Sequence, residues 1–158
     1  MRRKDREITE KDEIIEIIKK CDVCRLAFYD YEFPYIVPMN FGFSFIDNEI
    51  TLYFHCANEG KKLDILKANN HVCFEMDCSH KLIEGELACN YSMEYESVIG
   101  NGMIEVLENE DKIQALTLIM KKYSNASHFE FEEKNVNAVT LLKLNVKNIT
   151  AKRLKKST

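Results

Sequence analysis

The sequence predicts a mainly β domain, a small closed or split antiparallel barrel with helices at its periphery. Several segments alternate apolar and polar residues with a period of two, which is typical of strands that bury one face. Strands and helices do not alternate along the chain as they do in parallel α/β folds. The 158 residues contain no linker, repeat or low-complexity tract, so we expect one domain over residues 1–158.

The chain is expected to begin with a helix followed by a strand. Thr9 and Asp12 resemble a capping box at a helix start. The apolar run over 23–29 predicts the first strand. The helix between them has an apolar stripe at helical spacing, formed by Ile14, Ile15, Ile17 and Ile18.

The clearest strand signal lies over residues 35–45, where every odd position is apolar. This period of two predicts a single strand with one packed face. Asp47 and Asn48 then predict a hairpin turn, because both residue types tolerate positive φ. The returning strand over 50–56 places His55 on the face opposite its apolar residues.

The second half of the chain continues the pattern. We expect a helix over about 59–68 that starts at Asn58, then a strand over 72–76. A long strand over 94–107 contains two glycines. The last strand starts at 138 and changes apolar phase near its middle, which predicts a bulge or a bend. A helix from about 110 lies between these strands, with one apolar face formed by Ile113, Leu116, Met120 and Tyr123.

Composition excludes several classes of function. No apolar run approaches the roughly 18 residues that span a bilayer, and the N-terminus does not resemble a secretory signal. The formal net charge of -4 is a weak basis for nucleic-acid binding. Six cysteines are too few for a disulfide scaffold in a chain of this length, so we expect reduced thiols and a cytoplasmic location.

A candidate anion site lies where the strand over 50–56 leads into the next helix. Lys61 and Lys62 fall in the first turn of that helix, where the helix dipole disfavours cations. Both lysines are explained if an anion binds there to free backbone N–H groups, and Gly60 would let a ligand approach the backbone. A phosphate is the natural candidate. The alternative is that both lysines are solvated and partly offset by Glu59.

Two neighbouring features could belong to the same site. His55 precedes the anion site by a few residues, so it could orient a ligand or handle a proton, and it is the candidate catalytic residue. A histidine that only makes structural hydrogen bonds is the alternative. Pro38 interrupts a strand ladder, which indicates an edge, a bulge or a docking place. The polar face around Asn40 could accept a flat ligand, or it could be the solvated outside of a barrel.

Other motifs are weaker. Cys73, Cys78, His80 and Cys89 lack the paired spacing of zinc sites, so we expect no metal centre. Cys21 and Cys24 form a C-x-x-C that follows a helix and enters a strand, the reverse of the thioredoxin order, and we interpret them as buried thiols. The basic run over 152–156 could touch RNA, but a solvated terminus is the commoner explanation.

Four motifs, in this order and at these separations, carry a resemblance over nearly the whole chain: Tyr35–Gly42, Leu52–His55, Gly60–Leu63 and Ser97–Gly102. They resemble the flavin-binding split-barrel proteins of the pyridoxamine 5′-phosphate oxidase superfamily, and especially the branch of nitroimidazole-resistance (Nim) proteins. The resemblance implies a six-stranded split barrel that forms a homodimer, with two flavin mononucleotides (FMN) at the interface.

The resemblance also implies roles for particular residues. By matching position, the flavin ring would lie along Pro38, Met39, Asn40 and Phe41, near Ser97. His55 and Ala57 would lie beside the ring or the ribityl chain. The phosphate would lie at Gly60, Lys61 and Lys62. The implied function is an FMN-dependent oxidoreductase of small molecules, nitroimidazole-type compounds among the candidates.

The sequence leaves alternatives open for the electron donor and for the cofactor. NAD(P)H would have to bind transiently over the flavin as electron donor, because the chain has no GxGxxG fingerprint. Pyridoxamine phosphate is not expected as substrate, because no basic cluster for a second phosphate is present. The alternatives are a non-catalytic flavin- or haem-binding module, and an RNA-associated protein with a basic tail.

Overall fold

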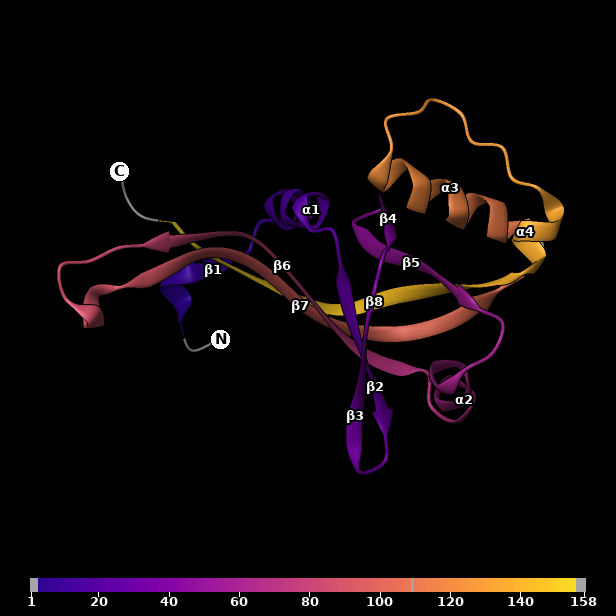
Figure 1. The fold of residues 1–158 in the computed structure, drawn as a ribbon, viewed down its shortest axis with the longest axis horizontal. Coiled ribbons are helices and arrows are strands. Elements are labelled where there is room, and N and C mark those ends of the chain that lie inside the picture. The colour runs from indigo at the N-terminus through magenta and orange to yellow at the C-terminus, as the bar shows by residue number, and fades with distance from the viewer. Residues whose placement is uncertain (1–2, 109, 156–158) are drawn as a thin grey trace.

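The computed structural model describes residues 3–108 and 110–155, and an antiparallel sheet of eight strands dominates it (Figure 1). The strands run in the order β3-β2-β6-β7-β8-β5-β4, and β1 pairs with β8 outside this path. The mainly β, split-barrel architecture with flanking helices is confirmed. The expected number of six strands is wrong, because the segment over 35–45 divides into two strands and β1 is additional.

The helices and strands have well-defined bounds. In chain order they are η1 (Lys4–Arg6), β1 (Glu7–Ile8), α1 (Lys11–Lys20), β2 (Cys24–Asp30), β3 (Phe33–Met39), β4 (Gly42–Ile46), β5 (Glu49–Ala57), α2 (Lys61–Ala68), β6 (His71–Ile83), η2 (Ala88–Asn90), β7 (Ser92–Leu107), α3 (Asp111–Tyr123), α4 (Glu133–Asn137) and β8 (Val139–Leu154).

The break between β3 and β4 is the main departure from the expected strands. β3 pairs with β2 at one edge of the sheet, whereas β4 pairs with β5 at the other edge. The chain crosses between the edges at Asn40 and Phe41, and the fully buried Phe41 donates its backbone N–H to Tyr123 Oη at 3.0 Å. The alternation of apolar and polar residues continues through the crossing, because the connecting segment places the Phe41 side chain in the core. Pro38 lies in an edge strand, where a missing N–H costs least.

Two hydrophobic clusters hold the fold. The larger cluster fills the barrel and includes the apolar residues of β2, β5, β6 and β8 together with the isoleucine stripe of α1. The smaller cluster lies under α3 and consists of Leu107, Ala115, Ile119 and Leu141.

The buried face of α3 differs from the expected one. Ala115 and Ile119 are buried, whereas Ile113, Met120 and Tyr123 are 43%, 39% and 42% exposed. The small Ala115 side chain lets α3 approach the sheet closely, and on β4 a Cβ at Gly42 would lie 2.5 Å from the Ile119 amide nitrogen. Close approach therefore decided which face of α3 is packed.

The turns and helix starts agree with the sequence in part. Asp47 and Asn48 have φ of 51° and 66°, as expected for the β4–β5 turn. The bulge in β8 is confirmed, because the register with β7 skips one residue at Lys147. The expected helix starts at Thr9 and Asn58 are wrong.

The true helix starts are Glu10 for α1 and Gly60 for α2. The Thr9 hydroxyl contacts the Glu10 carboxylate at 3.4 Å instead of a backbone N–H. The Asn58 amide donates to the Asn137 carbonyl at 2.8 Å and accepts from the Thr140 hydroxyl at 2.9 Å, so it ties the end of β5 to β8.

The paired β6 and β7 extend beyond the barrel as an arm, along which β1 and the end of β8 also lie (Figure 1). Arg153, in the basic run over 152–156, is held by Glu96 and Glu13, and Lys156 lies outside the described residues. This pairing favours a structural role for the run. None of the helices in the described ranges is long and apolar enough to cross a membrane.

Candidate functional site

The start of α2 leaves backbone donors free in a glycine-led turn. Gly60 adopts φ of 131°, and its carbonyl accepts the N–H groups of Leu63 and Asp64. No side chain caps the helix, and within residues 3–108 and 110–155 the N–H groups of Lys61 and Lys62 have no hydrogen-bond acceptor. Apart from its two chain neighbours, no described residue would lie within 4 Å of a Cβ at Gly60, so the backbone is open to a ligand. These are the features of a helix start that binds an anion.

The Lys61 side chain extends to the tip of the β2–β3 hairpin. Its Nζ lies 2.6 Å from Asp30 Oδ2 and 4.9 Å from the centre of the Tyr35 ring. The hydrogen bond to Asp30 raises the pKa of the Lys61 ammonium, so the lysine remains charged. In this structure, Lys61 is therefore already ion-paired with a carboxylate of the protein itself.

Lys62 differs from Lys61. It is half-buried, and it has no ion-pair partner among the residues that the structure describes. Its charge influences the Cys56 thiol, whose pKa is raised by burial and lowered in part by the nearby Lys62 ammonium. Lys62 is therefore a lysine in the first turn of α2 whose charge no described carboxylate neutralises, and it could bind a phosphate by a charge-assisted hydrogen bond.

His55 and Ala57 lie on the outer face of β5. Both are exposed, whereas Leu52, Phe54 and Cys56 between and before them are buried in the barrel. The expectation that His55 faces away from the core is confirmed. Its imidazole has no hydrogen-bond partner in the described parts of the chain, so it is available to a ligand.

The predicted ring-binding segment is divided between surface and core. Pro38 and Asn40 are exposed, and the Asn40 amide donates to the Asp22 carbonyl at 3.3 Å. Met39 and Phe41 are 8% and 0% exposed, so their side chains belong to the core and only their backbone could meet a ligand.

Ser97 is far from the start of α2 within one chain. It pairs with Asp77 and Lys152 on the arm side of β7, whereas His55 is linked through Leu141 to Leu107 at the other end of the same strand. The residue steps from Ser97 to Leu107 cover about 33 Å of strand. The chain therefore brings His55, Ala57 and Gly60–Lys62 into one region and leaves Ser97 outside it.

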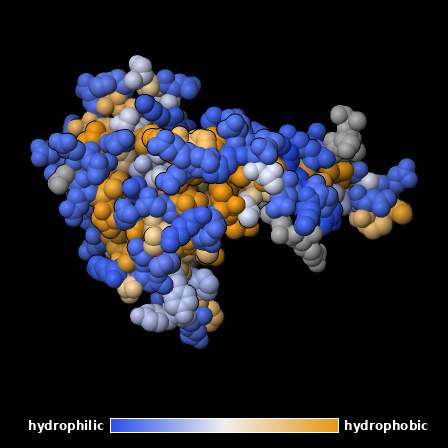
Figure 2. Space-filling model, turned by 180° about the vertical axis from the view of Figure 1, so that it is seen from behind, coloured by the Kyte–Doolittle hydropathy of each residue, from blue (hydrophilic) through white to orange (hydrophobic). Residues whose placement is uncertain are grey.

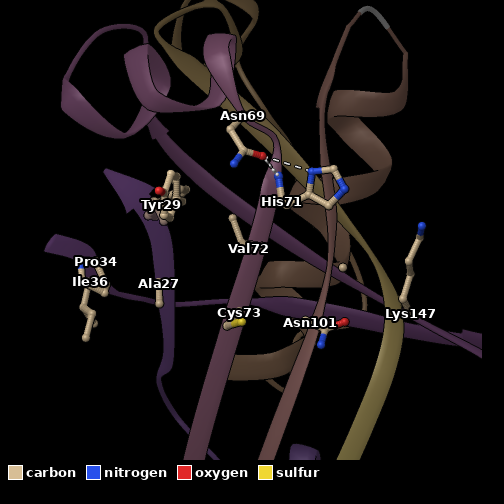
Figure 3. Close-up of a pocket in the computed structure, with 12 residues that line it drawn as sticks. Ala27, Tyr29, Pro34, Ile36, Asn69, His71, Val72, Cys73, Asn101 and Lys147 are labelled. Carbon is tan, nitrogen blue, oxygen red and sulfur yellow. Dashed lines mark hydrogen bonds between the residues drawn. The ribbon is translucent and has the colours of Figure 1, made fainter. Parts of the chain in front are cut away.

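An apolar groove that the sequence did not reveal lies on the outer face of β2, β3 and β6. It has a volume of about 700 Å³ and is lined by Tyr29, Pro34, Ile36, His71 and Cys73, among others (Figure 3). Asn69 Oδ1 holds the His71 ring at 3.0 Å. Apolar residues are also exposed over the middle of the molecule, above the β2–β3 hairpin, in Figure 2.

This groove adjoins a second cavity of about 320 Å³ between the β2–β3 hairpin and α2. Tyr29 and Asn69 line both cavities, and Lys61 lines the second. The apolar groove thus continues into a polar cavity at the start of α2, which Lys61 lines together with Asp30 and Asp64. The groove can hold a flat apolar ligand, and the free N–H groups of the α2 start and Lys61 are the groups near it that could bind an anion.

A family model for pyridoxamine 5′-phosphate oxidase matches residues 10–153, which is most of the chain. The protein belongs to the pyridoxamine 5′-phosphate oxidase family. No curated protein sequence matches the chain.

Several solved structures are also similar to this chain. A Bacteroides thetaiotaomicron VPI-5482 protein assigned to 5-nitroimidazole antibiotic resistance is 38% identical, with 93% of this chain and 86% of that chain covered and a TM-score of 0.81. The flavocytochrome Anf3 from Azotobacter vinelandii is 15% identical, with 99% and 72% covered and a TM-score of 0.81. An FAD and haem binding protein from Mycobacterium smegmatis is 17% identical, with 96% and 74% covered and a TM-score of 0.78. The last two show the fold alone.

In this member of the pyridoxamine 5′-phosphate oxidase family, the six cysteines are free thiols. Cys21 and Cys24 are fully buried, as expected, and burial raises the pKa of each thiol. The structure assembles no group of three or more metal ligands among the residues it describes. The groove was missed because Tyr29 and His71 meet only through the pairing of β2 with β6, which no local pattern encodes.

Proposed function

We propose that the protein is a flavin-dependent oxidoreductase of small molecules, and that the start of α2 holds the phosphate of FMN. The observation that carries this proposal is the Gly60–Lys62 turn, with two lysines, two free N–H groups and an open backbone. A phosphate fits this set of donors, because a helix start combines N–H groups and a favourable dipole with the ammonium charges.

A bound flavin would supply the redox chemistry, and the protein would supply binding and electrostatics. Lys62 would hold the phosphate directly, with Lys61 and the Gly60 turn beside it. His55 and Ala57, exposed on β5, would flank the ring or ribityl chain, and His55 is the candidate for holding a proton near the ring. Pro38 and Asn40 would offer side chains to the ring, whereas Met39 and Phe41 would offer only backbone atoms.

A homodimer would complete this site. Ser97 lies ten residues along β7 from Leu107, the residue to which His55 is linked through Leu141, and ten residues of extended strand cover about 33 Å. This separation favours an arrangement in which Ser97 and His55 reach the flavin from two copies of the chain, which supports FMN binding at a dimer interface. The exposed apolar residues Tyr29, Ile36 and Ile99, on the outer face of β2, β3 and β7, support the same arrangement.

The proposal also names a class of substrate and an electron donor. Nitroimidazole-type compounds are candidate substrates, and the 38% identity to the Bacteroides protein supports them. NAD(P)H is the proposed transient electron donor. All six cysteines are free thiols, which supports a location in the reducing cytoplasm.

The decisive experiment compares FMN with riboflavin, which lacks the phosphate. Lys61→Ala/Lys62→Ala should weaken FMN binding at least about tenfold, because charge-assisted hydrogen bonds to the phosphate are lost. Riboflavin binding should change little. The matched control is Lys121→Ala/Lys134→Ala, which removes two exposed lysines on α3 and α4, away from the start of α2. Equal losses for FMN and riboflavin would show that the fold was damaged.

The absorption spectrum of the purified protein provides an independent test. Flavin bands, present on purification or after reconstitution, support the proposal. A Soret band would instead indicate a haem-binding module, and a protein that takes up neither group would contradict both functions.

A further inference from the structure

The proposed phosphate site contains an anion that belongs to the protein itself. Asp30, the last residue of β2, places its carboxylate 2.6 Å from Lys61 Nζ. The next residue, Tyr31, has φ of 49° at the turn of the hairpin, so Asp30 is held at the hairpin tip that faces α2. The Asp30 side chain is 26% exposed and the Lys61 side chain is 57% exposed.

We propose that Asp30 competes with the phosphate of FMN for Lys61 and thereby weakens binding at the start of α2. This inference rests on the proposed function. Two anions that share one ammonium repel each other, so a phosphate that engages Lys61 must displace the Asp30 carboxylate or bear its repulsion. The Lys61 side chain is long, flexible and more than half exposed, so it can leave Asp30 without disturbing the core.

The two lysines would then have unequal roles. Lys62 has no competing carboxylate within the described ranges, so its charge is always available to a ligand. Lys61 is available only when it leaves Asp30 and the Tyr35 ring. Lys62→Ala should therefore weaken FMN binding more than Lys61→Ala does in the wild-type background.

The chain offers a matched control for the loss of charge. Asp64 lies in the first turn of α2 and lines the same cavity as Asp30, but it pairs with Lys67 at 2.9 Å and does not contact Lys61. Asp30→Asn and Asp64→Asn change the net charge equally. Only Asp30→Asn also releases Lys61.

The experiment measures FMN and riboflavin affinity of the apo protein by the quenching of flavin fluorescence. Asp30→Asn should tighten FMN binding by about twofold to fivefold, the range expected for loss of one exposed ion pair. Asp64→Asn should produce a smaller change, and riboflavin affinity should not respond to either variant. In a Lys61→Ala background the gain from Asp30→Asn should disappear, which identifies Lys61 as the residue through which Asp30 acts. The melting temperature of apo Asp30→Asn should rise more with inorganic phosphate than that of wild type.

The outcomes separate this inference from the function on which it rests. If Lys61→Ala/Lys62→Ala loses FMN affinity but Asp30→Asn binds FMN equally or more weakly, Asp30 positions Lys61 and the competition is disproved. If the double lysine variant keeps full FMN affinity, the phosphate does not bind at α2, and both the proposed site and the role of Asp30 are overturned.

Discussion

Arg153 Nε lies 2.6 Å from Glu96 Oε1 and joins the end of β8 to a fully buried carboxylate in β7. Lys20 Nζ, at the end of α1, and Ser79 Oγ, in β6, each donate to Glu96 Oε2 at 2.8 Å. Burial alone would raise the pKa of Glu96, but these hydrogen bonds hold it at about 2. One carboxylate therefore ties three strands and a helix together where the arm leaves the barrel.

Glu96→Gln should destabilise the protein. The neutral amide weakens the contacts of Glu96 with Arg153 and Lys20 and the longer ion pair with Lys155, so the free energy of unfolding should fall by roughly 1.5–3 kcal/mol. Urea denaturation of the apo protein measures this change. Glu105→Gln, on an exposed part of the same strand, is the control and should change stability far less. Equal effects of the two substitutions would show that burial of Glu96 adds nothing.

The contribution of Glu96 should depend on pH in a defined direction. Its pKa in the folded protein, about 2, lies below the ordinary value of a glutamate. Its stabilising effect is therefore complete above the unfolded pKa of about 4.3, and is lost as the pH falls from there toward the folded pKa. The difference in unfolding free energy between wild type and Glu96→Gln should be constant from pH 7 to 5 and shrink below that. A constant difference down to pH 3 would contradict this origin.

Gly42→Ala should also destabilise the protein, through the packing of α3. A Cβ at position 42 would lie 2.5 Å from the Ile119 amide nitrogen and 2.6 Å from the Leu118 carbonyl carbon, so helix backbone must move. Overpacking of this kind costs roughly 1–3 kcal/mol. Thermal melting of the apo protein tests this, with the exposed Ser92→Ala as control. An unchanged melting temperature would mean that α3 is loosely held.

His55→Ala separates a functional histidine from a structural one. Because His55 is exposed and has no hydrogen-bond partner in the described parts of the chain, the stability of the apo protein should change by less than about 0.5 kcal/mol. FMN should bind more weakly, and turnover should fall by more than the loss of bound flavin explains. Melting curves and turnover per bound flavin are the measurements. Large apo destabilisation with unchanged turnover per flavin would leave His55 as a structural residue.

The proposed homodimer can be tested at the exposed apolar face of β3. Ile36 is 59% exposed there, and Ile46, at the end of β4, is 65% exposed on a different edge of the sheet. In sedimentation at micromolar concentration, the wild type should be dimeric, Ile36→Lys should be largely monomeric, and Ile46→Lys should remain dimeric. A wild-type monomer in the presence of FMN would disprove the dimer.

Local sequence patterns determined the parts of this protein that depend on neighbouring residues. The alternation over 50–56 identified the buried side of β5, and Asp47 and Asn48 identified its turn, because strand faces and turns depend on residues close in sequence. The proposed anion site was predicted in the same way, since glycine and two lysines at a helix start are adjacent in the chain, and the binding of an anion there stays a prediction. The lack of βαβ alternation was enough for the fold class.

Long-range packing decided the rest. The break at Asn40 follows from the need to cross between sheet edges, and the packed face of α3 follows from its close approach to Gly42. The partner of Lys61 could not be predicted, because Asp30 is remote in sequence and reaches the lysine only through the fold. The strand order and the close approach of α3 to β4 depend on contacts between residues that are far apart in the sequence. Such contacts form only when the whole barrel folds, so local sequence patterns could not predict them.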